Sequence, residues 1–276
     1  MYKKSFAPTN TNKRVYEVSA DNTKSYNKYP DGQIKTKVIQ ELQNLKNTEN
    51  PFFIACGFVR PHLPFYAPKK YWDLYDRASI TIADNQYKPI NAPDELVGSN
   101  EFWAYDHDGI EVNSSEWHRM MRHGYYACVS YVDDLVGEIL EELDTLGLAN
   151  NTLIVLWGDH GFHLGEHNYW SKHNTLYHST RIPLIFKGPG VASGTANGMI
   201  ESVDIFPTLC DLAGIAKPSQ LHGKSFTSVS TNPAVNIRDH VYVRYDDLID
   251  GVVTLEGASI ITEIIATHVI TQTIIP

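Results

Sequence analysis

The stretch "LIVLWGDHGFHLGEHNYWSKHN", residues 153–174, decides the fold, because an apolar run changes abruptly into a polar, histidine-rich segment. Its first five residues, 153–157, are hydrophobic, and Gly158 follows them. A run this short predicts a strand covered on both faces, as in a parallel sheet. In open parallel sheets, ligands bind where the carboxyl ends of the strands meet the loops. Asp159 and His160, the first polar residues after the run, therefore lie where a functional site is expected.

The composition is that of an ordinary soluble globular protein of one or two domains. The 276 residues are 42% hydrophobic and 11% aromatic, enough to bury a substantial core. No run approaches the length of a membrane span, and the polar start has no apolar stretch of the signal-peptide kind. Three widely spaced cysteines predict neither a disulfide framework nor a zinc site. A net charge of −9 argues against a nucleic-acid partner and confines any anion site to a local basic patch.

Periodic apolar positions and turn residues predict alternating helices and strands. Helical spacing predicts helices over residues 32–46 and 116–146, the second ended by Gly147. Apolar runs predict strands within residues 51–58, 153–157 and 182–190. A further short helix is expected over residues 203–215, and residues 61–113 predict a long irregular segment. This order is typical of a layered α/β domain.

Two of the predicted strands lead into candidate site residues. If "FFIAC" and "LIVLW" are parallel neighbours in one sheet, the loops that follow them leave the same carboxyl edge. Arg60 and His62 could then meet Asp159 and His160 over one crevice. The sequence permits this convergence without proving it.

Several segments resemble a known family. "TLIVLWGDHGFHLGEHNYWSK", "STRIPLIFKGPG", "VDIFPTLCDLAGI" and "LHGKSF" closely resemble the second half of the type I sulfatases of the alkaline phosphatase superfamily. Their pairing with "PFFIACGFVRPHLPFYAPKKYWDLYD" looks most like the iduronate-2-sulfatase branch. The match covers residues 32–230 in the family order. It implies an incomplete alkaline-phosphatase-like layered sheet flanked by helices, and a sulfuric ester hydrolase that acts on a sulfated carbohydrate.

The resemblance also implies roles for individual residues. Asp159 would be a ligand of one calcium ion, with His160 a ligand or sulfate contact. Lys172 would bind the sulfate group, and His62 would reach the same sulfate and protonate the leaving alcohol. Arg60 is a candidate contact for an anionic sugar, because a guanidinium suits carboxylate and sulfate oxygens. A cation, a lysine charge and a proton donor are the groups that sulfate ester cleavage needs.

Each of these residues also has an ordinary structural interpretation. The Asp159–His160 pair could be a helix-capping turn, His62 a packed loop residue and Lys172 an exposed surface lysine. The nearby histidines suggest a richer metal cluster, but calcium takes oxygen ligands and a shell of several histidines would suit zinc. We therefore expect none of these to touch the metal: His163, His167, His173, His178. We expect Glu166 to orient the turn and Arg181 to pair with a carboxylate.

One departure from the family pattern outweighs the matches. Type I sulfatases need a Cys/Ser-x-Pro/Ala-x-Arg motif, whose first residue becomes formylglycine, and an upstream acidic pair for the metal. Neither is found here. Cys56 and Arg60 have the motif's separation, but Phe58 occupies the proline or alanine position, so Cys56 is expected to be a core cysteine. The opening residues resemble the middle of a family member, so an amino-terminally truncated chain is expected.

The end of the chain leaves two interpretations open. Family members usually finish with a small antiparallel domain, but after "HVYVRYDDLIDG" this chain is β-branched and lacks lysine and arginine. A reading-frame change near Asp247 or an unusual pair of edge strands would explain this. We expect residues 1–235 to be the C-terminal part of a catalytic domain and residues 236–276 a remnant or altered subdomain.

Three function classes stay open. The first is a sulfatase, or the remainder of one, with a sulfated sugar or polysaccharide as substrate. The second is a non-catalytic fragment or degenerate relative. The third is a phosphodiesterase or phosphonate hydrolase of the same superfamily. The resemblance suggests a periplasmic, secreted or lysosomal location.

Overall fold

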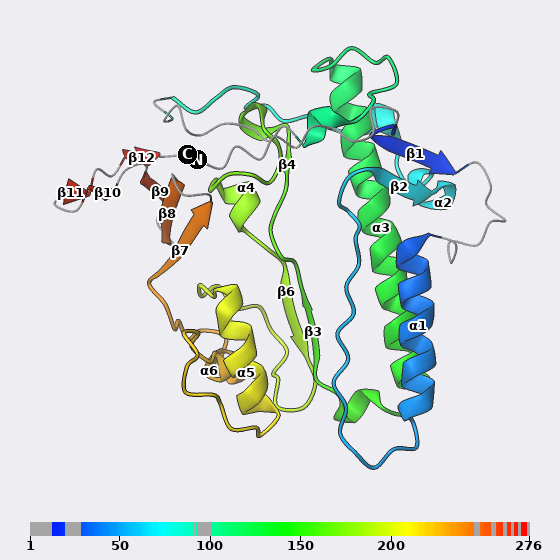
Figure 1. Ribbon diagram of the computed structural model, residues 1–276, viewed down its shortest axis with the longest axis vertical. Coiled ribbons are helices and arrows are strands. Elements are labelled where there is room, and N and C mark those ends of the chain that lie inside the picture. Colours follow the sequence, from blue (N-terminus) through cyan, green and yellow to red (C-terminus); the bar gives the residue numbers. More distant parts are fainter. Residues whose placement is uncertain are drawn as a thin grey trace. The chain divides into compact units, whose positions relative to one another are not determined.

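The computed structural model describes residues 13–19, 29–90, 92 and 101–245, and the backbone of short strands within residues 249–274 (Figure 1). The α/β chain divides into two compact units, each described by itself. Unit 1 comprises Met1–Gln86, Ser99–Ala149 and Leu164–Trp170, and unit 2 comprises Tyr87–Gly98, Asn150–His163 and Ser171–Pro276. The expected boundary near residue 235 stays a prediction.

Unit 1 is mainly helical. Its elements are β1 (Tyr16–Ser19), α1 (Pro30–Leu45), β2 (Phe65–Pro68), α2 (Lys69–Trp72), η2 (Arg77–Ser79), η3 (Phe102–Ala104), α3 (Ser115–Thr145) and η5 (Glu166–Asn168). The helices expected over residues 32–46 and 116–146 are thus confirmed as α1 and α3. The segment expected to be irregular contains β2, α2, η2 and η3 as short elements.

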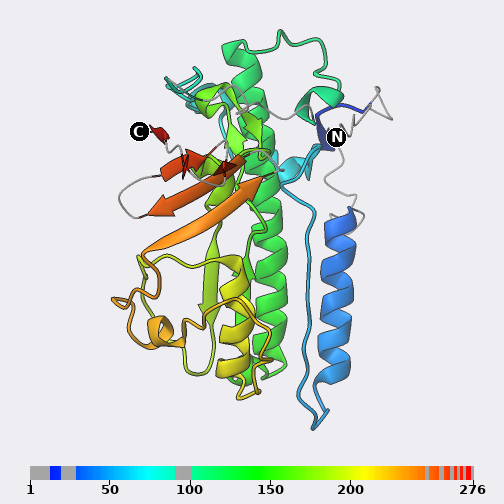
Figure 2. The ribbon, with the colours of Figure 1, turned by 60° about the vertical axis from the view of Figure 1, so that its left-hand side comes forward.

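The long helix α3 is the element on which unit 1 packs. The Ser114 side chain caps its start by accepting a hydrogen bond from the backbone N of Trp117 at 3.1 Å. Helix α1 lies alongside α3 (Figure 2), and Lys35 on α1 pairs with Glu138 on α3 at 2.7 Å. The buried face of α3 includes Trp117, Met121, Cys128, Tyr131 and Leu135.

A glycine on α3 allows β2 to approach closely. A Cβ on Gly124 would lie 2.9 Å from the Cβ of Phe65, which is fully buried. Glycine weakens a helix interior by about 1 kcal/mol relative to alanine, so the close packing of β2 on α3 explains its presence. Strand β2 also pairs in parallel with β1, from Tyr16↔Phe65 to Ser19↔Pro68.

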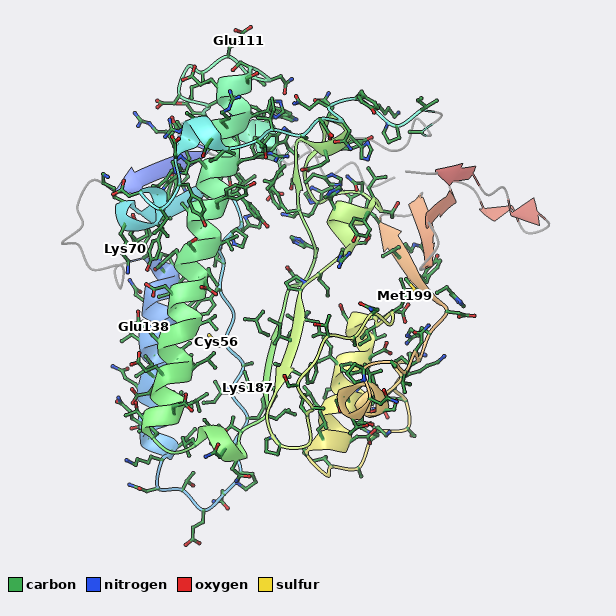
Figure 3. The ribbon with its side chains drawn as sticks, turned by 180° about the vertical axis from the view of Figure 1, so that it is seen from behind. Cys56, Lys70, Glu111, Glu138, Lys187 and Met199 are labelled. Carbon is green, nitrogen blue, oxygen red and sulfur yellow. The ribbon has the colours of Figure 1, made fainter. Side chains whose placement is uncertain are left out.

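The strand expected at "PFFIACGF" is wrong. Residues 51–59 belong to no strand, and Figure 1 draws them as an extended light-blue segment without an arrow. Phe53 is 82% exposed, and Cys56, labelled in Figure 3, is exposed instead of being a core cysteine. Among the described residues no strand pairs with this segment, and an apolar run becomes a buried strand only where a partner strand and a covering layer meet it.

Unit 2 contains the strand that opens the motif. Its elements are β3 (Ile154–Trp157), α4 (Tyr177–Thr180), β6 (Leu184–Lys187), η6 (Ser202–Asp204), α5 (Ile205–Leu212), α6 (Thr227–Thr231) and β7 (His240–Tyr245). At the borders of the units lie η4 (Ala149–Asn151), β4 (His163–Leu164) and β5 (Trp170–Ser171). The strands expected at residues 153–157 and 182–190 and the helix over residues 203–215 are confirmed.

The pairing of β3 differs from the expectation. Strand β3 pairs antiparallel with β6, with Val155 opposite Phe186, and not in parallel with "FFIAC". One face of this ribbon packs on a core of Ile205, Phe226 and Val229. Trp157 is 52% exposed, so complete coverage of the strand is also wrong within the described part of the chain. Hydrophobic runs indicate strands, but they do not identify the partner.

A buried ion pair holds the second half of unit 2 together. The Asp204 side chain is fully buried and accepts hydrogen bonds from the Arg238 Nε at 2.8 Å and from the backbone N atoms of Glu201 and Lys224 at 2.9 and 2.6 Å. Arg238 also lies 2.9 Å from a carboxylate oxygen of Glu201. These contacts join the start of α5 to the segments on both sides of α6.

The chain continues into a sheet with the strand order β12-β9-β8-β7. Its members beyond β7 are β8 (Ile249–Thr254), β9 (Ala258–Ile261) and β12 (Gln272–Ile274), and β10 (Ile264–Ile265) pairs with β11 (His268–Val269). All of these pairings are antiparallel. The alternative of a changed reading frame stays open, because it concerns the origin of the sequence. Within the described part of the chain, no helix is both long and apolar enough to cross a membrane.

Candidate functional site

The turn after β3 is held tightly against α4 and the segment that follows it. The backbone N of Gly158 donates to the carbonyl of Pro183 at 3.2 Å, and the N of Gly161 donates to the carbonyl of Ser179 at 2.8 Å. A Cβ on Gly161 would lie 2.0 Å from the carbonyl oxygen of His178, so a side chain does not fit there. The turn therefore presents Asp159 and His160 on a fixed backbone.

Asp159 points its carboxylate outward from this turn. Its side chain is 82% exposed, its Oδ1 accepts from the backbone N of His160 at 3.0 Å, and its Oδ2 lies 3.5 Å from the His160 Nε2. The other ring nitrogen of His160 lies 2.9 Å from the carbonyl of Gly161. An exposed carboxylate on a rigid turn is a suitable ligand for a hard cation.

The described residues supply only part of a calcium shell. Calcium takes six to eight oxygen ligands, whereas no group of three or more His, Cys, Asp or Glu side chains suited to a metal gathers anywhere in the described ranges. Asp159 fits such a cation by its chemistry, and His160 lies beside it. The remaining ligands would have to come from elsewhere.

Lys172 follows the β4–β5 hairpin, in a loop fixed by a buried asparagine. Ser171 adopts φ 76°, and the backbone N of Asn174 donates to the Lys172 carbonyl at 2.8 Å. The Asn174 Oδ1 accepts from the backbone N of Leu176 and from the hydroxyl of Ser179, both at 2.9 Å. Asn174 thus positions the lysine loop against α4. Sequence reasoning missed it, because a single asparagine carries no spacing signal.

Glu166 orients the hairpin, as expected, but its partner was not foreseen. Its two carboxylate oxygens accept from the backbone N of Leu164 and from the Arg122 guanidinium, both at 2.7 Å. Arg122 is buried on α3 and also donates to the carbonyls of Leu164 and Thr81. The separation of 44 positions between Arg122 and Glu166 hid this contact from local patterns. The expected carboxylate partner of Arg181 is not found among the described residues, where its guanidinium lies over the Tyr177 ring at 5.3 Å.

The other candidate residues lie on a loop of unit 1 that a buried carboxylate fixes. Asp31, in the first turn of α1, accepts from the backbone N atoms of Val59 and Arg60 at 2.8 and 3.0 Å. Arg60 donates to the carbonyl of His62 at 2.6 Å, and its guanidinium lies 5.9 Å from the centre of the Tyr66 ring. Asp31 was missed, because in the sequence it looks like an ordinary residue of a helix start.

His62 contacts a carboxylate that sequence reasoning also missed. Its Nε2 lies 3.1 Å from the Oε1 of Glu101, and its Nδ1 lies 2.8 Å from the carbonyl of Leu63. The side chains of His62 and Glu101 are 38% and 27% exposed, so both remain accessible at the surface of unit 1.

The sequence-predicted residues thus fall into two groups. Arg60 and His62 lie together in unit 1, and Asp159, His160 and Lys172 lie in unit 2. The meeting of the two groups over one crevice stays a prediction.

A family model described as "Sulfatase" matches residues 2–215. The human iduronate 2-sulfatase is 32% identical over 253 residues, which cover 79% of this chain and 46% of that protein. The chain spans about half the length of the curated relatives that it matches.

Two solved structures share the fold. One, in complex with its substrate D-glucosamine-2-N,6-O-disulfate, has a TM-score of 0.72 at 20% identity and covers 85% of this chain and 60% of its own. The other, a phosphonate monoester hydrolase from Silicibacter pomeroyi, has a TM-score of 0.74 at 19% identity, with 90% and 54% covered. At this identity the likeness shows the alkaline-phosphatase-like α/β fold alone.

Proposed function

Because this chain belongs to the sulfatase family, we propose that it supplies part of the active site of a sulfuric ester hydrolase that acts on a sulfated carbohydrate. The observation that carries the proposal is the turn after β3, where a backbone that tolerates no side chain at Gly161 presents the exposed Asp159 carboxylate. The substrate class rests on the iduronate 2-sulfatase relative. The same relationship supports a periplasmic, secreted or lysosomal location.

The candidate site residues would act on different parts of the sulfate ester. Asp159 and His160 would hold one side of a divalent cation, which when bound neutralises sulfate oxygens. Lys172 would place its ammonium charge against the sulfate, where a preorganised charge stabilises the transition state. His62 would donate a proton to the leaving sugar oxygen, and Arg60 would bind an anionic group of the sugar.

The nucleophile must come from residues outside the given 276. No Cys/Ser-x-Pro/Ala-x-Arg motif occurs in the sequence, and covalent attack at sulfur needs an activated nucleophile. The partial match to the motif at Cys56 is excluded by Phe58 at its third position. Sequencing the DNA upstream of Met1 for an in-frame motif and acidic pair is the first test.

We expect sulfate release only when the chain is produced together with a segment that carries the nucleophile motif. This combination is called the two-part protein, or the two-part enzyme where its activity is measured. The assay compares 4-nitrophenyl sulfate, a sulfated uronate oligosaccharide and 4-nitrophenyl phosphate. Faster turnover of the phosphate ester would favour the phosphodiesterase or phosphonate hydrolase class. No turnover of any ester by the two-part protein would favour a non-catalytic relative. Sulfate release by the 276-residue chain alone, lost on His62→Ala, would contradict an external nucleophile.

The partial metal shell leads to a prediction on calcium. Calorimetry on the 276-residue chain should give weak binding, with a Kd on the order of a millimolar or weaker, because one carboxylate supplies at most two of the six or more oxygens required. Adding the upstream acidic pair should tighten binding sharply, and Asp159→Ala should remove the gain. Tight binding by the chain alone that survives Asp159→Ala would contradict this assignment.

A further inference from the structure

The surroundings of the His62 ring determine which protons it carries. Its Nδ1 lies 2.8 Å from the carbonyl oxygen of Leu63, and its Nε2 lies 3.1 Å from a carboxylate oxygen of Glu101. A carbonyl and an ionised carboxylate both accept hydrogen bonds and donate none. A neutral imidazole has a single N–H and would satisfy only one of them. The other nitrogen would then turn its lone pair toward an oxygen.

We propose that Glu101 is a positioning residue that holds His62 as the imidazolium and accepts a hydrogen bond from its Nε2 proton until the leaving sugar oxygen takes that proton. The inference rests on the proposed function and deepens it, because general acid catalysis needs this protonated form before the ester bond breaks. Glu101 stands far from His62 in the sequence, at the N-cap of η3, and no motif assigns it a role.

The backbone around the ring is fixed independently of Glu101. Asp31 accepts from the backbone N atoms of Val59 and Arg60, and Arg60 donates to the His62 carbonyl. The loop therefore stays in place without the carboxylate. What Glu101 adds is the direction of the ring and a negative charge beside it.

The charged and titratable groups near the ring have opposing effects. The Arg60 guanidinium disfavours a second positive charge, whereas the Glu101 carboxylate favours it and makes the direct contact. Tyr105 also lies in this group, and burial, followed by the charge of Glu101, raises the pKa of its phenol. Tyr105 therefore stays neutral near pH 7, whereas the Glu101 carboxylate contacts His62 directly.

The proton transfer balances without a further reactant. When the nucleophile attacks sulfur, the bond between sulfur and the sugar oxygen breaks, and its electron pair stays on that oxygen. The leaving oxygen displaces the Glu101 carboxylate from the Nε2 proton and takes that proton, which leaves a neutral imidazole and an ionised Glu101 carboxylate. Solvent then returns a proton to the ring.

Chemical modification of the complete 276-residue chain tests this pairing without an activity assay. Diethyl pyrocarbonate reacts with neutral imidazole. The rate at which it modifies His62 therefore reports the protonated fraction of the ring. Mass spectrometry of the peptide that contains His62 measures this rate across pH. Glu101→Gln should raise the His62 rate near pH 7 by about three- to tenfold, a range set by a partly exposed ion pair. Glu101→Asp keeps the charge, so its His62 modification rate should fall between those of the unmodified chain and Glu101→Gln. This variant replaces Glu101→Gln if circular dichroism shows that Glu101→Gln is unfolded.

The matched control is Glu111→Gln, an exposed carboxylate labelled in Figure 3 in the loop before α3. It should leave the His62 rate unchanged. An unchanged His62 rate in Glu101→Gln, or an equal rise in the control, would overturn the inference, whatever the two-part protein does to sulfate esters.

Activity of the two-part enzyme gives the second readout. In Glu101→Gln the alkaline limb of the kcat profile should move to lower pH, because the ring loses its proton sooner, while KM changes little. A merely structural role would lower kcat equally at every pH. That result would also overturn the inference.

Discussion

Replacing Lys172 with alanine in the two-part enzyme is expected to lower kcat for sulfate ester hydrolysis by about 10²- to 10³-fold, the usual effect of removing one preorganised group that stabilises transition-state charge. The loop that carries Lys172 is fixed by Asn174, whose side chain accepts from Leu176 and Ser179. An ammonium on such a loop needs no rearrangement as charge builds on the sulfate. Steady-state kinetics with a sulfated uronate oligosaccharide measure the effect.

Lys187→Ala is the matched control for this prediction. Lys187 lies at the end of β6 in the same unit and is exposed, as labelled in Figure 3. Its removal should leave kcat within about twofold of the unmodified enzyme, because an exposed charge away from the sulfate is screened by solvent and salt. If Lys172→Ala retained full kcat, or lost no more than Lys187→Ala, the sulfate-binding role would be wrong.

Replacing Asp204 with alanine is expected to destabilise unit 2 by about 3–5 kcal/mol, the cost of leaving one partner of a buried ion pair uncompensated. Arg238 would lose its buried partner, and the backbone N atoms of Glu201 and Lys224 would lose their acceptor. The melting temperature followed by circular dichroism should fall by about 10 °C. Asp211→Ala removes an ion pair with Lys217 at the surface and should leave the melting temperature unchanged. Equal melting temperatures of the Asp204→Ala variant and the unmodified chain would contradict this assignment.

The ion pair between Asp204 and Arg238 also predicts how the stability of unit 2 depends on pH. Burial by itself raises the pKa of Asp204, but hydrogen bonds from Arg238 and from two backbone N–H groups outweigh it, and the pKa is lowered overall. A depressed pKa gives a stabilisation that is complete above the unfolded value of about 4. It is lost as the pH falls through the folded value. The difference in the free energy of unfolding between the Asp204→Ala variant and the unmodified chain should therefore become smaller below about pH 4.

The candidate site was predictable to the extent that its signals are local. Asp159, His160 and Lys172 follow a strand pattern within one short stretch, and His62 lies between two prolines after another apolar run. Their partners were not predictable. The contacts of Arg60 with Asp31, and of His62 with Glu101, join residues that no common period or motif connects. Such contacts form only when the chain folds back on itself.

The sequence by itself determined α1, α3, β3, β6 and α5, together with the family, because hydrogen bonding within a helix and the alternation of side chains along a strand depend on neighbouring residues. Only the tertiary structure decided that β3 pairs antiparallel with β6 and that "FFIAC" is a partly exposed segment outside any strand. Both outcomes depend on which backbones come within hydrogen-bonding distance. An apolar run records that a segment can be buried, but the partner that buries it is chosen by contacts between residues far apart in the chain.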